Sequence, residues 1–299
     1  MKEFNIKSNC DGLTLYGTII EPEGDIKGLV HFCHGMAEHR KRYYGVMEFL
    51  AKNGYVCMIH DYRGHGQSVL SKDDLGYFYD DSATYIIEDV KQAMIAFKDM
   101  YKGLPLTLFG HSMGSLVVRK YIKLYPELVD KLVVCGSPSA NPAVSAAILL
   151  TKIFTKLKGD HYRPKLIHNM AFSAYDNKFG KNESWLSVNM DNAIAYAKDE
   201  LCGFMFTCNG FMNLFTLLKD VYDLKGWKVV NKNMPILFIA GQEDPCIGDE
   251  KQWLEAQDFL RKVGYTNIEK ILYPGMRHEV LLETEKEKVY KDVLQFIKK

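Results

Sequence analysis

One serine of this chain sits between glycines in a pattern suited to nucleophilic chemistry. Ser112 is the central residue of the segment Gly-His-Ser-Met-Gly at 110–114, which directly follows an apolar run at 104–109. A Gly-x-Ser-x-Gly turn between a strand and a helix exposes the serine oxygen on a strained bend. Ser112 is therefore the candidate nucleophile. The alternative is a serine that only caps the following helix.

A nucleophilic serine needs two partners, because its hydroxyl reacts slowly at neutral pH without a base. An imidazole takes the proton, and a carboxylate orients and stabilises that imidazole. Asp244 follows the predicted strand 236–240, and His278 follows the predicted strand 268–273. The order Ser112, Asp244, His278, with each residue after a strand, is the order of the α/β-hydrolase triad.

Such a triad also requires hydrogen-bond donors for the oxyanion of the tetrahedral intermediate. In the α/β-hydrolase layout one donor is the amide after the nucleophile, here Met113, and the other comes from the loop after an earlier strand. That loop, 34–39, reads His-Gly-Met-Ala-Glu-His. We expect the backbone N–H groups of Met36 and Met113 to be the donors, and His34 to be a structural residue of the loop.

The elements that must position these residues alternate along the chain. Alternation of strands and helices predicts βα units around a mostly parallel sheet, which is the α/β-hydrolase fold. The amphipathic opening pair, which ends near 21–24, looks antiparallel and is expected at an edge of the sheet. The expected strands are 13–20, 28–33, 55–60, 106–109, 131–135, 236–240 and 268–273, and the expected helices are 42–52, 84–101, 115–125, 249–262 and 284–298.

The alternation stops after residue 138 and resumes at 234. We therefore expect a hydrolase core made of 1–138 and 233–299, with 139–232 inserted as a helical cap. Its apolar helical stretches fit either a packed cap interior or an acyl-chain pocket, and cap lysines allow a transient contact with a lipid surface. The candidate pocket residues are Ile148, Phe154, Phe204, Phe211 and Phe215.

Composition excludes several classes of partner. The 299 residues carry a formal net charge of only +1, so we expect no nucleic-acid binding. No secretory signal or 18-residue apolar run is present, which predicts a cytoplasmic protein without a membrane span. The seven cysteines are scattered without a C-x-x-C pair, and we expect no disulfide framework, metal or cofactor. The oligomeric state is not indicated.

Four segments resemble the monoacylglycerol lipase and lysophospholipase-like branch of the α/β-hydrolases, which is grouped by sequence with the serine aminopeptidases. They are residues 34–43, 61–68, 110–114 and 278–283, and a weaker likeness at 199–207 is common in bacterial members. The resemblance implies the triad and oxyanion amides given above. It also implies that Glu38 and Arg42 brace the oxyanion loop.

The expected activity is cofactor-independent hydrolysis of carboxylic esters with an apolar acyl part, such as monoacylglycerols, lysophospholipids or small esters. An aminopeptidase or amidase is the alternative, with the cap acids Glu183, Asp191, Asp199 and Glu200 as candidates to hold a substrate ammonium. An acyltransferase on the same triad and a non-catalytic ligand-binding protein also stay open. Cys246 departs from the aliphatic residue of many bacterial relatives and is either a small filler or a modifiable thiol beside the triad.

Overall fold

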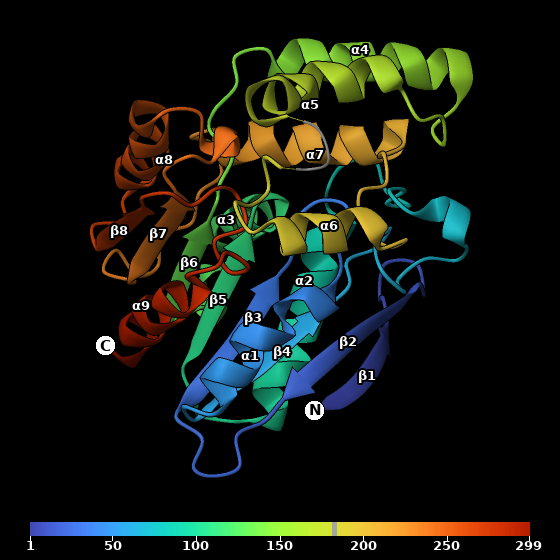
Figure 1. Cartoon of the computed structure of the whole chain (residues 1–299). Coiled ribbons are helices and arrows are strands. Elements are labelled where there is room, and N and C mark those ends of the chain that lie inside the picture. The colour runs from blue at the N-terminus through green and yellow to red at the C-terminus, as the bar shows by residue number, and fades with distance from the viewer. Residues whose placement is uncertain (181–183) are drawn as a thin grey trace.

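Eight strands in the described part of the chain form one sheet at the centre of the molecule (Figure 1). The computed structural model describes residues 1–180 and 184–299. The strand order is β1-β2-β4-β3-β5-β6-β7-β8, with antiparallel pairing from β1 to β2 and from β2 to β4 and parallel pairing elsewhere. The strands are β1 (Lys2–Lys7), β2 (Thr14–Ile20), β3 (Gly28–Cys33), β4 (Tyr55–His60), β5 (Leu106–His111), β6 (Lys131–Cys135), β7 (Ile236–Gly241) and β8 (Ile268–Tyr273).

Helices cover both faces of this sheet, because successive strand residues point to opposite sides. In β4, Val56 and Met58 pack into one core, whereas Cys57 and Ile59 pack into the other. The first core also contains α2, α3 and α8, and the second contains α1 and α9. The bounds of these helices are α1 (Tyr44–Ala51), α2 (Tyr85–Met100), α3 (Met113–Leu124), α8 (Glu250–Val263) and α9 (Lys286–Lys298).

This arrangement confirms the predicted α/β-hydrolase fold, and the seven strands expected from the sequence are present. The expected antiparallel pair at the sheet edge is formed by β2 and β1, and β1 is the strand whose bounds the sequence did not indicate. Its side chains are largely exposed, so its apolar signal is weak. The expected helix 42–52 is a 3-10 turn at Arg40–Tyr43 followed by α1.

The inserted residues are helical wherever the structure describes regular elements between 139 and 232. These helices lie over the carboxyl ends of the parallel strands (Figure 1). Helix α4 packs along α7, and α7 packs on α3, so α7 is the layer that joins the insertion to the sheet. The exact division into core and cap stays a prediction. The helices are α4 (Val144–Lys158), α5 (Lys165–Phe179), α6 (Met190–Lys198) and α7 (Cys208–Val221).

Candidate active site

Ser112 stands on a sharp turn between the last residue of β5 and the first residue of α3. Its φ of 54° and ψ of −121° are unusual for a residue with a side chain, and such strain is concentrated at functional sites. The turn needs glycine at both flanks. A Cβ at Gly110 would collide with the Gly114 carbonyl, and a Cβ at Gly114 would collide with the Cys33 carbonyl. The Ser112 side chain makes no cap hydrogen bond to α3, which disfavours the capping alternative.

His278 and Asp244 form a buried pair at the carboxyl end of the sheet. The Nδ1–H of His278 donates to the Asp244 carboxylate, with distances of 3.0 Å to Oδ1 and 2.9 Å to Oδ2. The Cys246 N–H also donates to Asp244 Oδ1, at 2.8 Å, and fixes the carboxylate in its turn. Close packing explains Gly136, since a Cβ there would lie 3.2 Å from Asp244 Oδ2 and 3.3 Å from the His278 ring.

The pKa of His278 lies above its ordinary value of 6.5. Burial alone lowers this pKa, because it disfavours the imidazolium. The charge and hydrogen bond of Asp244 outweigh burial, and the charges of Glu279 and Glu38 add to their effect. The site thus stabilises the protonated imidazole that forms when a base accepts the proton of a nucleophile.

Ser112 and His278 line the same cavity, which places the candidate nucleophile and base together. Within residues 1–180 and 184–299, no hydrogen bond joins their side chains. Catalytic contacts of this kind tighten when substrate binds, so the apo geometry is compatible with proton transfer. The structure therefore brings Ser112, Asp244 and His278 to one place from three separate strand ends.

Met36 and Met113 border the same cavity, as expected for oxyanion donors. Neither backbone N–H is hydrogen-bonded to another group of the described chain. Free N–H groups beside a nucleophile can bind a developing oxyanion. The assignment of the oxyanion hole to these two amides stays a prediction that this geometry supports.

Glu38 and Arg42 hold the loop that carries Met36. Glu38 accepts a hydrogen bond from the Gly35 N–H at 2.5 Å through Oε1, and its Oε2 lies 2.7 Å from Arg42 Nη1. Burial raises the pKa of Glu38, but His111 and Arg42 outweigh burial and hold it well below the ordinary range. Glu38 is therefore a fixed anion.

Arg42 bonds a second carboxylate that the sequence analysis did not assign a role. Its guanidinium contacts both oxygens of Glu279, at 2.5 and 2.8 Å, and so joins the oxyanion loop to the loop of His278. Asn192 of α6 bridges the two, accepting from Arg42 at 3.0 Å and donating to Glu279 at 2.6 Å. The position of Glu279 directly after His278 was the available signal for this role.

His111 links the same network to the base. Its Nε2–H donates to the backbone carbonyl of His278 at 3.1 Å, and the Tyr43 hydroxyl lies 3.0 Å from its Nδ1. Both ring nitrogens of His34 bond to the backbone. Its Nδ1–H donates to the Gly35 carbonyl at 2.8 Å, and its Nε2 accepts from the Tyr62 N–H at 3.0 Å. Burial lowers the pKa of His34 to about 4. These contacts give His34 a structural role.

The cavity above Ser112 has a volume of about 730 Å³, and its walls are mostly apolar. Of the five predicted pocket residues, Phe204 and Phe215 line it. Ile148 and Phe154 instead pack half-buried against the core, and Phe211 is buried within it. The apolar lining contributed by α4, α5, α7 and the loop before α7 is Val144, Ala146, Ala147, Leu150, Ile167, Met170, Ala171, Phe172, Phe204, Leu214, Phe215 and Leu218.

Trp185 is a cavity residue with no sequence signal. The centroid of its ring lies 5.2 Å from that of the His278 ring and 5.2 Å from that of the Tyr175 ring. The Trp185 ring thus packs against an imidazole whose residue is only 2% exposed. Side-chain packing of this kind depends on the path of the insertion, which periodicity does not define.

The acids proposed for an ammonium site do not reach the cavity where the structure describes them. Asp191 is exposed, Asp199 pairs with His39 at 2.9 Å, and Glu200 pairs with Lys72 at the surface at 2.5 Å. Glu183 lies outside the described residues. The carboxylates that border the described cavity are Glu38 and Glu279, and both are bonded to Arg42.

Cys246 borders the cavity beside Asp244. Burial raises the pKa of its thiol well above the ordinary value, and the Asp244 charge raises it further. A thiol held in its protonated form is a poor nucleophile. This environment favours the filler interpretation of Cys246 over that of a modifiable thiol.

The fold and this site define an α/β-hydrolase. The model of the family described as serine aminopeptidase S33 (Hydrolase_4) matches residues 24–285, and the chain belongs to this family. It is 26% identical over 299 residues to a monoglyceride lipase homolog of Monkeypox virus, covering 98% of this chain and 97% of the relative. It is also 26% identical to a monoacylglycerol lipase of Mycolicibacterium smegmatis, covering 96% and 93%. A carboxyl esterase from Bacillus coagulans superposes with a TM-score of 0.91 at 22% identity, covering 99% and 97%.

Helices long and apolar enough to span a bilayer are absent from the part of the chain that the structure describes.

Proposed function

We propose that this protein is a serine hydrolase that cleaves carboxylic esters with an apolar acyl part, with monoacylglycerols as the substrate class. The observation that carries the proposal is the placement of Ser112 and the His278–Asp244 pair at the base of a mostly apolar cavity. The full-length similarity to lipases of this class supports it.

The chemistry proceeds through an acyl-enzyme. Ser112 Oγ attacks the ester carbonyl carbon while His278 Nε2 takes its proton, and Asp244 stabilises the resulting imidazolium. The tetrahedral intermediate collapses as His278 returns the proton to the leaving alcohol. A water then gives its proton to His278 and attacks the acyl carbon. His278 returns this proton to Ser112 Oγ as the acyl–oxygen bond breaks, which releases the acid and restores Ser112.

The oxyanion loop supplies electrostatic stabilisation in both halves of this cycle. Met36 and Met113 border the cavity, and within the described residues their N–H groups have no hydrogen-bond partner. These two groups would bind the carbonyl oxygen as it becomes negative. Removal of one such donor typically costs about 3–4 kcal/mol in other hydrolases. The Glu38–Arg42 pair holds the loop in place without occupying these amides.

Esters are favoured over aminoacyl substrates by the charges at the cavity. A free α-ammonium needs a carboxylate that can face it, because burying an unpaired charge is costly. Glu38 and Glu279 are engaged by Arg42 in the described structure, and the remaining lining is largely apolar.

The test is kcat/KM for p-nitrophenyl esters and monoacylglycerols of increasing chain length, measured beside an aminoacyl-naphthylamide. We expect hydrolysis of both ester series, a preference for acyl chains longer than acetyl, and little cleavage of the amide. Cleavage of the aminoacyl substrate at rates matching the best ester would contradict the assignment. Acyl transfer to added glycerol in preference to water would identify an acyltransferase instead.

A further inference from the structure

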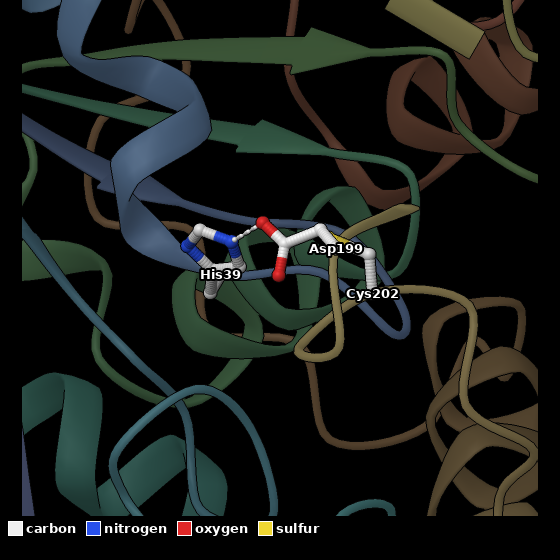
Figure 2. A group of neighbouring side chains, drawn as sticks. All are labelled: His39, Asp199 and Cys202. Atoms are coloured by element: carbon white, nitrogen blue, oxygen red, sulfur yellow. Dashed lines mark hydrogen bonds and ion pairs between the residues drawn. The ribbon is translucent and has the colours of Figure 1, made fainter. Parts of the chain in front are cut away.

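A second group of ligating side chains lies outside the cavity, where the oxyanion loop meets the segment after α6. His39 Nε2 and Asp199 Oδ2 are 2.9 Å apart, and the donor atoms of His39, Asp199 and Cys202 all lie within 4.8 Å of one another. Figure 2 shows the imidazole and the carboxylate pointing toward each other, with Cys202 on the same loop as Asp199. The spacing of the cysteines could not indicate this group, because His39 and Asp199 are 160 residues apart.

The local backbone holds these side chains in position without a metal. The Leu201 N–H donates to Asp199 Oδ1 at 2.9 Å, which leaves Oδ2 turned toward His39. The Cys202 N–H donates to the Asp199 carbonyl at 2.9 Å and closes the turn. His39 and Cys202 are buried, whereas the Asp199 side chain is 37% exposed and gives access from solvent.

We propose that His39, Asp199 and Cys202 form a binding site for a thiophilic divalent cation of the zinc class. Imidazole nitrogen, carboxylate oxygen and thiolate sulfur are the three donor types that zinc takes in proteins, and a water would complete a tetrahedron. Softer thiolate ligation selects against magnesium and calcium, which take oxygen ligands.

Metal binding changes two proton positions. The Cys202 thiol releases its proton to solvent, because the thiolate is the ligand. Coordination through His39 Nε2 requires the imidazole proton to sit on Nδ1, so the metal replaces the 2.9 Å contact with Asp199. The 3.3 Å hydrogen bond from the Lys41 N–H to Nδ1 is then lost.

Charge around the group is compatible with a cation. Burial raises the pKa of the Cys202 thiol and outweighs the opposite effect of the Arg42 charge, which also acts on Asp199. Its guanidinium is already bonded to the carboxylates of Glu38 and Glu279. The two carboxylates of Glu38 and Glu279 offset the positive charge of Arg42, which would otherwise repel a bound metal ion.

A metal here would join the oxyanion loop more firmly to the inserted segment. The Ala37 carbonyl already accepts from the Gly203 N–H and from the Tyr196 hydroxyl, both at 2.9 Å. His39 lies two residues beyond Ala37, and Cys202 directly precedes Gly203. The metal would replace the direct His39–Asp199 contact between the same two segments by a bridge that also includes Cys202. Occupancy should therefore raise the thermal stability of the fold.

The probe is Co²⁺, which reports thiolate ligation by an intense sulfur-to-metal charge-transfer absorption. Wild-type protein is titrated with Co²⁺ beside Cys202→Ser, Cys246→Ser and Cys10→Ser. We expect one Co²⁺ per chain with this absorption in the wild type and in the Cys246→Ser and Cys10→Ser variants, and its loss in Cys202→Ser. Cys246→Ser is the most important control, because the donor atoms of Asp244, Cys246 and His278 in the active site are also close enough together to hold a metal ion.

Zinc is then tested by the shift in Tm, which is independent of hydrolysis. Wild type and Cys246→Ser should gain Tm with Zn²⁺, and Cys202→Ser and Asp199→Asn should not, although each variant unfolds cooperatively without metal. Loss of the absorption in Cys246→Ser with its retention in Cys202→Ser would overturn the proposal, and so would an absent absorption in the wild type. Neither result bears on whether Ser112 is a nucleophile.

Discussion

The floor and the roof of the cavity are held by different kinds of interaction. The floor consists of the loops that carry Met36, Ser112, Asp244 and His278, and its polar groups are fixed by short hydrogen bonds and ion pairs. The roof consists of α4, α5, α7 and the residue Phe204, which meet the cavity through apolar side chains. Under the proposed function, the floor would determine which bond is attacked, and the roof would determine which acyl chain fits.

The two parts also differ in how tightly each residue is held. Removal of a floor group leaves buried charges or a misoriented imidazole, which is costly. Removal of a roof methylene changes contact area and volume alone, and such changes are smaller. The following substitutions should separate the two parts, beginning with the largest effect.

Asp244→Asn should reduce kcat by about 10⁴-fold, because the amide no longer stabilises the imidazolium or selects the correct tautomer. Glu243→Gln is the matched control, since Glu243 is a neighbouring, largely exposed acid. Steady-state kinetics on one p-nitrophenyl ester measures both variants. Retention of activity within tenfold by Asp244→Asn would remove Asp244 from the triad.

Arg42→Met should lower the free energy of unfolding by about 3–5 kcal/mol, because the buried carboxylates of Glu38 and Glu279 would both lose their guanidinium partner. Arg261→Met provides the comparison: Arg261 is 45% exposed and pairs with Asp258 on the surface of α8. We expect that control to change stability by less than about 1 kcal/mol. Urea unfolding measures the free energy of unfolding of both variants. Equal losses would show that the Arg42 network stabilises the fold no more than a surface ion pair does.

The pH dependence of kcat/KM should report the pKa of His278, the proposed base. His278 must be neutral to accept the proton of Ser112, and its pKa lies above the ordinary 6.5. Activity should therefore rise with pH through a midpoint above 6.5 and fall about tenfold per pH unit on the acid side. A midpoint at or below 6.5 for the free enzyme would contradict the dominant effect of Asp244 over burial.

Leu150→Asn should impair long-chain esters about tenfold more than acetate esters, because it places an amide in the apolar lining. Leu149→Asn is the adjacent control, since Leu149 is 61% exposed and does not line the cavity. The ratio of kcat/KM between the two ester classes is the readout. The same ratio in both variants would mean that the acyl chain does not pass along α4.

The sequence could predict the floor because its residues follow from backbone geometry. Gly110 and Gly114 define the turn of Ser112, and the order of strands brings Asp244 and His278 to the same sheet edge. The sequence could not predict the roof in detail. Ile148, Phe154 and Phe211 are as apolar as Phe204 and Phe215, and only the packing of the helices decides which of them face the cavity.

The contacts between roof and floor were the least predictable part. Arg42 meets Asn192 across 150 residues, and His39 meets Asp199 across 160. No local pattern encodes such pairs, because Asn192 in α6 and Asp199 directly after it are brought to Arg42 and His39 by the path of the whole insertion.

Covalent labelling of Ser112 tests the central claim most directly. Wild-type protein is treated with a fluorophosphonate and followed by intact mass, beside Ser112→Ala and the neighbouring Ser115→Ala. The account predicts one rapid adduct per chain in the wild type and in Ser115→Ala, mapped by peptide analysis to Ser112, and none in folded Ser112→Ala. An unlabelled wild type, or an adduct that persists in Ser112→Ala, would contradict it.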